Sequence, residues 1–121
     1  MNNRKINNGE TGMAVIRRFG SVIGVRPEKL AYYKHLHANP WPEVNAMITK
    51  CNIRNFTIYY HDGLLFSYLE YIGDDYETDQ KMMAQDSATR RWWAETAPCQ
   101  LPLPGAGEGG WMEMEPLYHL D

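Results

Sequence analysis

The sequence predicts an α+β fold of the split βαβ, or ferredoxin-like, type with an antiparallel sheet. The expected elements come in the order strand, helix, strand, strand, helix, strand. An Asp62-Gly63 pair gives a hairpin signal between the second and third strands, and 121 residues fit one domain, which we take as residues 13–121. Such a sheet carries helices on one face. We therefore expect a second copy of the sheet to cover the other face in a symmetric homodimer.

The first strand is expected to follow a leader segment. Residues 1–12 are polar, rich in Asn and without a hydrophobic period, so we interpret them as a disordered leader. The stretch from Ala14 to Val25 contains the β-branched residues Val22 and Ile23, which are typical of a strand.

Two short helices separated by prolines come next. Pro27 suits the first position of a helix, because its missing N–H would have no partner there. We expect this helix over residues 27–38, before Pro40. Pro42 can begin the next helix, which we expect over residues 42–51.

The middle of the chain predicts the hairpin. Residues 55–60 and 64–72 are rich in β-branched and aromatic side chains, which favour strands. The short turn between them, with Asp62-Gly63, pairs them as antiparallel neighbours.

The last third of the chain predicts helix, loop and strand. Asp74 and Asp75 are candidate N-caps for a helix through Ala84, and Asp86 or Ser87 can cap a second helical segment. The stretch 98–110 is rich in Pro and Gly and predicts a loop near a pocket, and residues 111–120 predict the last strand.

Composition excludes several classes of function. A net charge of −3 gives no basic patch, so we expect no nucleic-acid partner. No apolar run is long enough to cross a bilayer and no secretory signal precedes the domain, so we expect a cytoplasmic protein without membrane contact. Cys51 and Cys99 lack metal-ligand spacing, and in a reducing compartment we expect no disulfide between them.

His37 is the strongest candidate for a catalytic residue. Tyr33 lies four residues before it, so the phenol and the imidazole share one helical face beside the proline break. Imidazole can give and take a proton near neutral pH, which suits general acid–base catalysis. The alternative is a packed or surface histidine, and we interpret the other three histidines in that way: His35, His61 and His119.

No motif indicates a metal or a nucleotide. His35 and His37 are two residues apart, which is a poor spacing for two ligands on one helix, and HExxH and CxxC are absent. GxGxxG, P-loop and GxSxG motifs are absent too, and the glycines at 105–110 precede a strand, not a helix. We therefore expect no metal and no cofactor.

Several of these residues together resemble the L-rhamnose mutarotase family. The pattern Tyr-x-x-x-His-x-x-x-Trp-Pro-Glu covers residues 33–43. A second motif, Asn-aromatic-x-Ile-Tyr, covers residues 55–59. The third is Arg91-Trp92-Trp93. The resemblance covers about residues 13–121 and is specific because the first motif and the tryptophan pair occur together.

The resemblance implies a fold and an activity. The fold is a dimeric α+β barrel of ferredoxin-like subunits. The activity is the exchange of α and β anomers of L-rhamnose, a 6-deoxy-L-hexose, by opening and closing the sugar ring without a cofactor. The family's proton donor falls on His37.

The resemblance also implies residues that bind the sugar. They fall on Tyr33, Trp92 and Trp93, and Trp41 within the first motif is a further candidate. A second substrate-contacting tyrosine of the family falls on Phe56, so this chain lacks one hydroxyl at that position.

Three other functions fit the same residues. A related branch of the family acts on L-fucose, and the sequence does not separate the two sugars. A haem-type monooxygenase with a dimeric α+β barrel shares the fold, and fold does not fix function. A non-catalytic sugar-binding module would use the same aromatic residues.

Overall fold

A computed structural model describes residues 4–7, 13–107 and 109–121 of the chain. The expected disordered leader, residues 1–12, therefore lies largely outside the described residues. Within it, Arg4–Asn7 form strand β1, which pairs antiparallel with residues 13–16.

The centre of the sheet is β2 (Met13–Val25). β4 (Leu64–Tyr71) and β6 (Met112–Met114) both pair with β2 at Gly20, so they occupy its two opposite edges. β3 (Ile53–His61) pairs with β4, which gives the order β6–β2–β4–β3. All these pairs are antiparallel, and the predicted split βαβ arrangement is confirmed.

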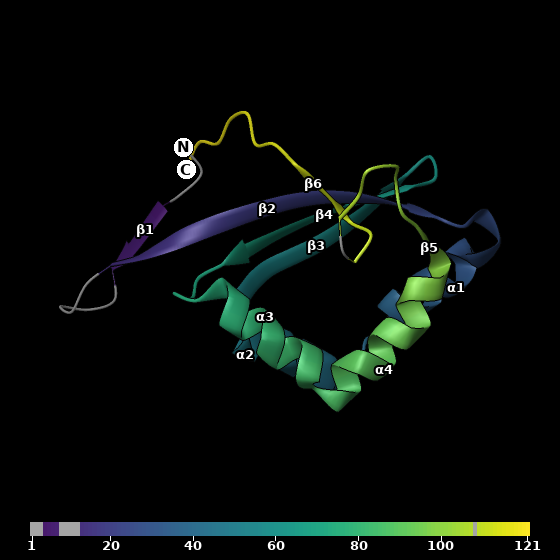
Figure 1. Cartoon of the computed structure of the whole chain (residues 1–121), viewed down its shortest axis with the longest axis horizontal. Helices are drawn as coiled ribbons and strands as arrows, with labels where there is room; N and C mark the ends of the chain where they lie inside the picture. The colour runs from purple at the N-terminus through teal and green to yellow at the C-terminus, as the bar shows by residue number, and fades with distance from the viewer. Residues whose placement is uncertain (1–3, 8–12, 108) are drawn as a thin grey trace.

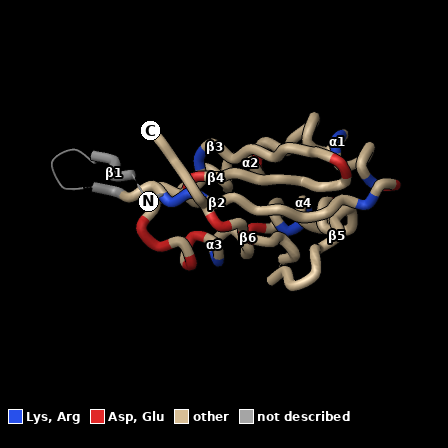
Figure 2. Tube along the Cα trace, turned by 90° about the horizontal axis from the view of Figure 1, so that it is seen from above, with Lys and Arg blue, Asp and Glu red and all other residues tan. Residues whose placement is uncertain are grey.

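The helices lie on one side of this sheet (Figure 1). The helix predicted from Pro27 begins as a 3₁₀ turn (Pro27–Lys29) and continues as α1 (Leu30–Ala38), and α2 (Pro42–Lys50) begins at Pro42 as predicted. α3 (Tyr76–Gln85) and α4 (Ser87–Thr96) follow β4 and meet in a V. Figure 2, seen from above, shows β3, β4 and β2 side by side, with Lys and Arg spread over several elements.

The predicted helix caps are confirmed. The Asp75 carboxylate accepts a hydrogen bond from the backbone N–H of Thr78 at 3.1 Å. Asp86 accepts one from the N–H of Thr89 at 2.9 Å. Because Asp86 ends α3 and caps α4, this residue fixes the corner between the two helices.

The predicted last strand, residues 111–120, is wrong beyond Met114. The chain soon reaches Pro116, which has no N–H to donate to a neighbouring strand. The apolar residues of this tail are at least 76% exposed: Leu117, Tyr118 and Leu120.

The predicted loop, residues 98–110, is partly ordered into regular structure. A 3₁₀ turn (Ala97–Cys99) leads into β5 (Gln100–Leu101). β5 pairs with the end of β2, with Leu101 opposite Gly24. The stretch is therefore attached to the sheet where it begins.

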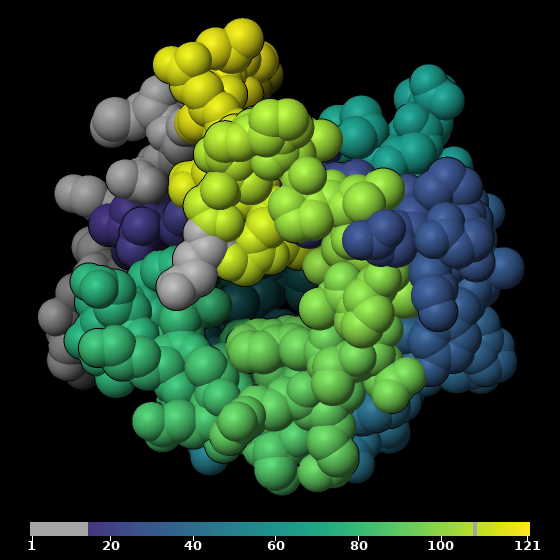
Figure 3. Space-filling model, turned by 45° about the vertical axis from the view of Figure 1, so that its right-hand side comes forward, coloured from purple at the N-terminus to yellow at the C-terminus, as the bar shows by residue number. Residues whose placement is uncertain are grey.

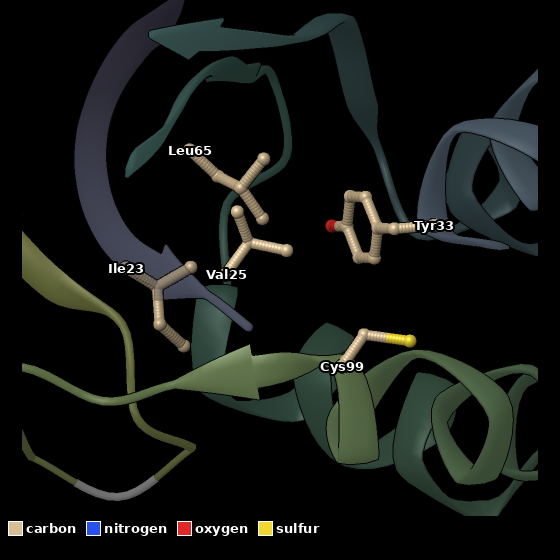
Figure 4. Close-up of a cluster of buried hydrophobic side chains, with 5 residues drawn as sticks. All are labelled: Ile23, Val25, Tyr33, Leu65 and Cys99. Atoms are coloured by element: carbon tan, nitrogen blue, oxygen red, sulfur yellow. The ribbon is translucent and has the colours of Figure 1, made fainter. Parts of the chain in front are cut away.

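One part of the core lies between the sheet and α1. Ile23 and Val25 of β2 pack with Leu65 of β4, Tyr33 of α1 and Cys99, and each is at most 4% exposed. Figure 4 shows these five side chains pointing toward one another, with the Tyr33 ring entering from its helix. This cluster fixes the position of α1 over the sheet.

A second buried cluster holds α3 against the sheet, and Tyr71 is its polar anchor. The Tyr71 hydroxyl donates to the Asp79 carboxylate at 2.5 Å and accepts from the Asp75 N–H at 3.0 Å. Asn52 donates to the same oxygen of Asp79 at 3.0 Å. Burial, and then the hydrogen bond to Asp79, raise the pKa of Tyr71 to about 12.

Replacing Tyr71 by Phe should lower the free energy of unfolding by about 1–3 kcal/mol, because two polar partners lose their hydrogen bond. Urea unfolding at neutral pH measures this loss. The difference between the two proteins should then shrink with alkali. Because folding raises the pKa of Tyr71, the stability that its hydroxyl contributes is fully present below the pKa of about 10 in the unfolded chain. This contribution is lost as the pH rises through about 12, the pKa in the folded protein. A gap that stays constant up to pH 12 would contradict this account.

Candidate functional site

A large cavity lies between the sheet and the helices. Its volume is about 970 Å³, and it opens to solvent in the hollow that Figure 3 shows between α3, α4 and the segments around β6. Its lining includes all six residues predicted for the site: Tyr33, His37, Trp41, Phe56, Trp92 and Trp93. The remaining histidines, at 35, 61 and 119, do not line it.

Four of these residues form an aromatic cluster, which we define as Tyr33, His37, Trp41 and Trp92. The Tyr33 and His37 rings are 4.3 Å apart between centroids, as their spacing on α1 predicts. The Trp92 ring approaches His37 edge-on at 5.2 Å and Trp41 at the same distance. An imidazole is thus held between a phenol and an indole on the wall of the cavity.

A hydrogen bond fixes the orientation of the His37 ring. Nδ1 lies 2.8 Å from the backbone carbonyl oxygen of Tyr33. A carbonyl oxygen accepts and cannot donate, so Nδ1 carries the hydrogen. Nε2 is the ring nitrogen left for a ligand. It is an acceptor when the ring is neutral and a donor when the ring is protonated.

Tyr33 is a neutral phenol at this site. Its side chain is 4% exposed, and its hydroxyl lies 3.5 Å from Nε2 of Gln100, which donates to it. Burial raises the pKa of Tyr33, and the Gln100 contact offsets part of that rise. Near neutral pH the hydroxyl can donate or accept a hydrogen bond, but it does not act as an anionic base.

Contacts between helices set the position of the cluster. The Tyr32 hydroxyl donates to the Glu95 carboxylate and so connects α1 to α4. Trp41 precedes Pro42, the first residue of α2, and is the N-cap of that helix. The proline break therefore brings an indole from a third helix into the site.

A β-bulge places Phe56 at the cavity. The register of β3 against β4 shifts between Arg54 and Thr57, and Asn55 has a φ of 52°. Such a bulge bends the strand and redirects a side chain. Phe56 lines the cavity and is 44% exposed, while Trp93 is 42% exposed at the edge of the same space.

Other reactive groups do not form a second centre. Burial raises the pKa of both Cys51 and Cys99, so each stays a protonated thiol and a poor nucleophile. Both are free. Among the described residues no group of three or more His, Cys, Asp or Glu side chains could hold a metal ion. No helix in the described part of the chain is long and apolar enough to span a membrane.

Sequence reasoning missed Gln100. It lies in the stretch predicted as a loop near a pocket, but no local pattern indicates that its amide reaches the Tyr33 hydroxyl across 67 positions. Pairing of β5 with the end of β2 produces this contact.

Comparison with known proteins supports one family. The model of the L-rhamnose mutarotase family matches residues 18–120. The L-rhamnose mutarotase of Bacillus subtilis (strain 168) is 32% identical over 85 residues, covering 69% of this chain and 79% of that protein. The L-rhamnose mutarotase of Ligilactobacillus salivarius (strain UCC118) is 28% identical over 109 residues, covering 86% and 97%.

Two solved structures share the fold. The L-rhamnose mutarotase FA22100 from Formosa agariphila has a TM-score of 0.67 at 16% identity, covering 87% of this chain and 99% of that one. The tetracenomycin F2 cyclase of Streptomyces glaucescens, a polyketide cyclase, has a TM-score of 0.63 at 11% identity, covering 87% and 97%. At these identities the two likenesses concern the fold alone, which hosts different chemistries.

The His37 geometry predicts a specific tautomer. The neutral ring should carry its hydrogen on Nδ1, because the Tyr33 carbonyl can only accept. Long-range ¹H–¹⁵N NMR of the imidazoles, at a pH where they are neutral, distinguishes the two tautomers. A His37→Gln variant assigns the signal. Observation of a hydrogen on Nε2 in the neutral ring would contradict the geometry.

Proposed function

Because this chain belongs to the L-rhamnose mutarotase family, we propose that it interconverts the α and β anomers of L-rhamnose. The observation that carries this proposal is the orientation of His37. Its Nδ1 is held by the Tyr33 carbonyl, and its ring lies between Tyr33 and Trp92 on the cavity wall. One ring nitrogen is thus left to give and take protons.

Mutarotation needs only proton transfers around one bond. A proton reaches the ring oxygen and another leaves the anomeric hydroxyl, so the bond between the anomeric carbon and the ring oxygen breaks and an open-chain aldehyde forms. Rotation of the aldehyde and the reverse steps close the ring with the other configuration. Protonated His37 gives its Nε2 proton to the ring oxygen and regains it on closure. Water takes the second proton, which leaves the anomeric hydroxyl.

The surrounding residues orient the sugar. The Tyr33 hydroxyl, kept neutral by its raised pKa, forms a hydrogen bond with a substrate hydroxyl. The indoles of Trp92, Trp93 and Trp41 provide apolar surface against the face of the sugar that carries the methyl group. Phe56 contributes apolar contact and no hydrogen bond where the family has a tyrosine.

The proposal requires no metal and no cofactor, because ring opening changes no oxidation state and His37 supplies the acid. We also propose a cytoplasmic location, because free cysteines such as Cys51 and Cys99 persist in a reducing compartment.

We also propose that two copies pack sheet to sheet. The face of the sheet opposite the helices carries Tyr59, which is 64% exposed, and Met114, which is 37% exposed. The C-terminal tail adds exposed Leu117 and Tyr118. A second copy would bury this apolar surface.

Activity is measured by exchange NMR on the anomeric protons of L-rhamnose. Transfer between the α and β signals should rise well above the rate in buffer when the protein is added. His37→Gln should lower the catalysed rate at least tenfold, within the factor of about 10²–10⁴ that a positioned acid–base group provides.

His35→Gln is the matched control. This histidine lies two residues away on α1 and its carbonyl and ring face Asn39, so the substitution should leave exchange intact. L-fucose, tested in parallel, decides between the two sugars. Exchange no faster than in buffer, with both sugars and folded protein, would remove the proposal. Sugar binding without exchange would favour a non-catalytic binding module.

The dimer is tested by sedimentation equilibrium. The wild-type protein should have twice the 14.0 kDa mass of the chain. Tyr59→Asp places a charge on the outer sheet face and should shift the mass toward one chain, because a buried unpaired charge is costly. Glu28→Gln, on the first turn before α1, serves as a surface control and should not change the mass. A wild-type protein of single-chain mass would reject the dimer.

A further inference from the structure

The cavity is longer than the aromatic cluster. Leu65 and Leu69 both line it and lie four residues apart on β4, so the floor extends about 13 Å along the strand. α1, which carries His37, and α3 lie at opposite ends of the helical layer in Figure 1, and both contribute to the lining. Pockets of about 300–1,000 Å³ hold drug-sized ligands, and a single 6-deoxy sugar is much smaller than such a ligand.

The end of the cavity away from His37 is a second compartment. We call it the far compartment and define it by Leu69 of β4 and by Tyr76, Gln80 and Met83 of α3. These three α3 residues are spaced by four and three, so they share one helical face. Gln80 lies six residues before the corner at Asp86 and Trp92 six residues after it, which is about 9 Å along each helix. The two side chains thus enter different parts of one cavity.

The far compartment contains an unused hydrogen-bond donor. Nε2 of Gln80 is buried and has no hydrogen-bond partner among the described residues. A buried donor without a partner is destabilising, and native structures leave few such groups without a reason. We therefore interpret the amide as a donor for a group that the described residues do not supply.

The surroundings of Gln80 define the chemistry of that group. The Tyr76 ring is stacked on Phe19 at 4.9 Å, so its orientation is fixed. Met83 and Leu69 add aliphatic surface. The charged side chain of the described lining is Lys34, on α1 at the other end. The Arg17 guanidinium lies over the Tyr76 and Phe19 rings, 5.2 and 5.0 Å from their centroids, and is not itself part of the lining. An amide donor beside aromatic and aliphatic walls, with no charged side chain among the described residues lining this end of the cavity, suits an uncharged ring that carries hydroxyl groups.

We propose that the far compartment binds a second, uncharged sugar unit joined to the 6-deoxy sugar at His37. The substrates of this site would then include short reducing oligosaccharides, with Gln80 donating to a hydroxyl of the second unit. This inference rests on the proposed mutarotase function. The anomeric hydroxyl of the 6-deoxy unit stays free, so the linkage uses another of its hydroxyls and is not cleaved. The same ring bond opens and re-forms, with the same two protons transferred.

The test compares two substrates by exchange NMR. One is L-rhamnose, and the other is a galactosyl-rhamnose disaccharide whose rhamnose keeps a free anomeric hydroxyl. The wild-type protein should exchange both, with a kcat/KM for the disaccharide at least equal to that for L-rhamnose. Gln80→Met keeps the length of the side chain and removes the donor. It should lower the ratio of the disaccharide to the monosaccharide kcat/KM about three- to tenfold. Gln80→Trp fills the compartment and should lower the ratio further.

A stability readout separates binding from a structural role. Gln80→Met should keep or raise the thermal midpoint, because it removes an unpaired buried donor. A lower midpoint with an unchanged ratio would mean that Gln80 serves the fold and would overturn its assignment. Exchange of L-rhamnose but not of the disaccharide would reject the far compartment and leave the mutarotase function standing. Exchange of neither sugar would reject the function itself.

Discussion

The hydrogen bond from His37 Nδ1 to the Tyr33 carbonyl is the interaction on which the site depends. It joins two residues four positions apart in the last turns of α1, so one short helix supplies the proposed acid–base group, its orientation and a neighbouring phenol. It also determines which ring nitrogen of the neutral histidine carries the hydrogen. With one nitrogen bound to the backbone, the proposed mechanism uses the other to give a proton to the ring oxygen on opening and to take it back on closure.

The sheet supports this arrangement through one close approach. A Cβ on Gly24 would lie 2.7 Å from the carbonyl oxygen of Leu101, so a larger residue would push β5 away from β2. β5 carries Gln100, whose amide contacts the Tyr33 hydroxyl. Glycine at position 24 therefore allows β5 to lie close enough to β2 for Gln100 to reach the Tyr33 hydroxyl. Gly24 itself lies outside the site and carries no reactive group.

Local features were predictable from the sequence, and tertiary ones were not. Prolines at 27 and 42, the caps at Asp75 and Asp86 and the Asp62-Gly63 turn act within a few residues, so they place the helices and the hairpin correctly. The approach of Trp92 to His37 and Trp41 depends on how α1, α2 and α4 pack, which no local pattern specifies. The bulge before Thr57 and the extended tail after Met114 depend on pairing partners, and the family resemblance rather than periodicity pointed to Phe56.

The same fold in a polyketide cyclase shows that the sheet and helices do not dictate the reaction. The cavity is open to solvent, and His37 is exposed at its wall. An open site suits the exchange of anomers, because the open-chain aldehyde recloses to one of the two anomers and water returns protons to the acid. Enzymes that protect a reactive intermediate have to exclude water by closing. The openness that would impair such an enzyme also leaves room along the sheet for more than one ring. We therefore infer that a reaction that does not require the exclusion of water permits both the long cavity and the exposed position of His37.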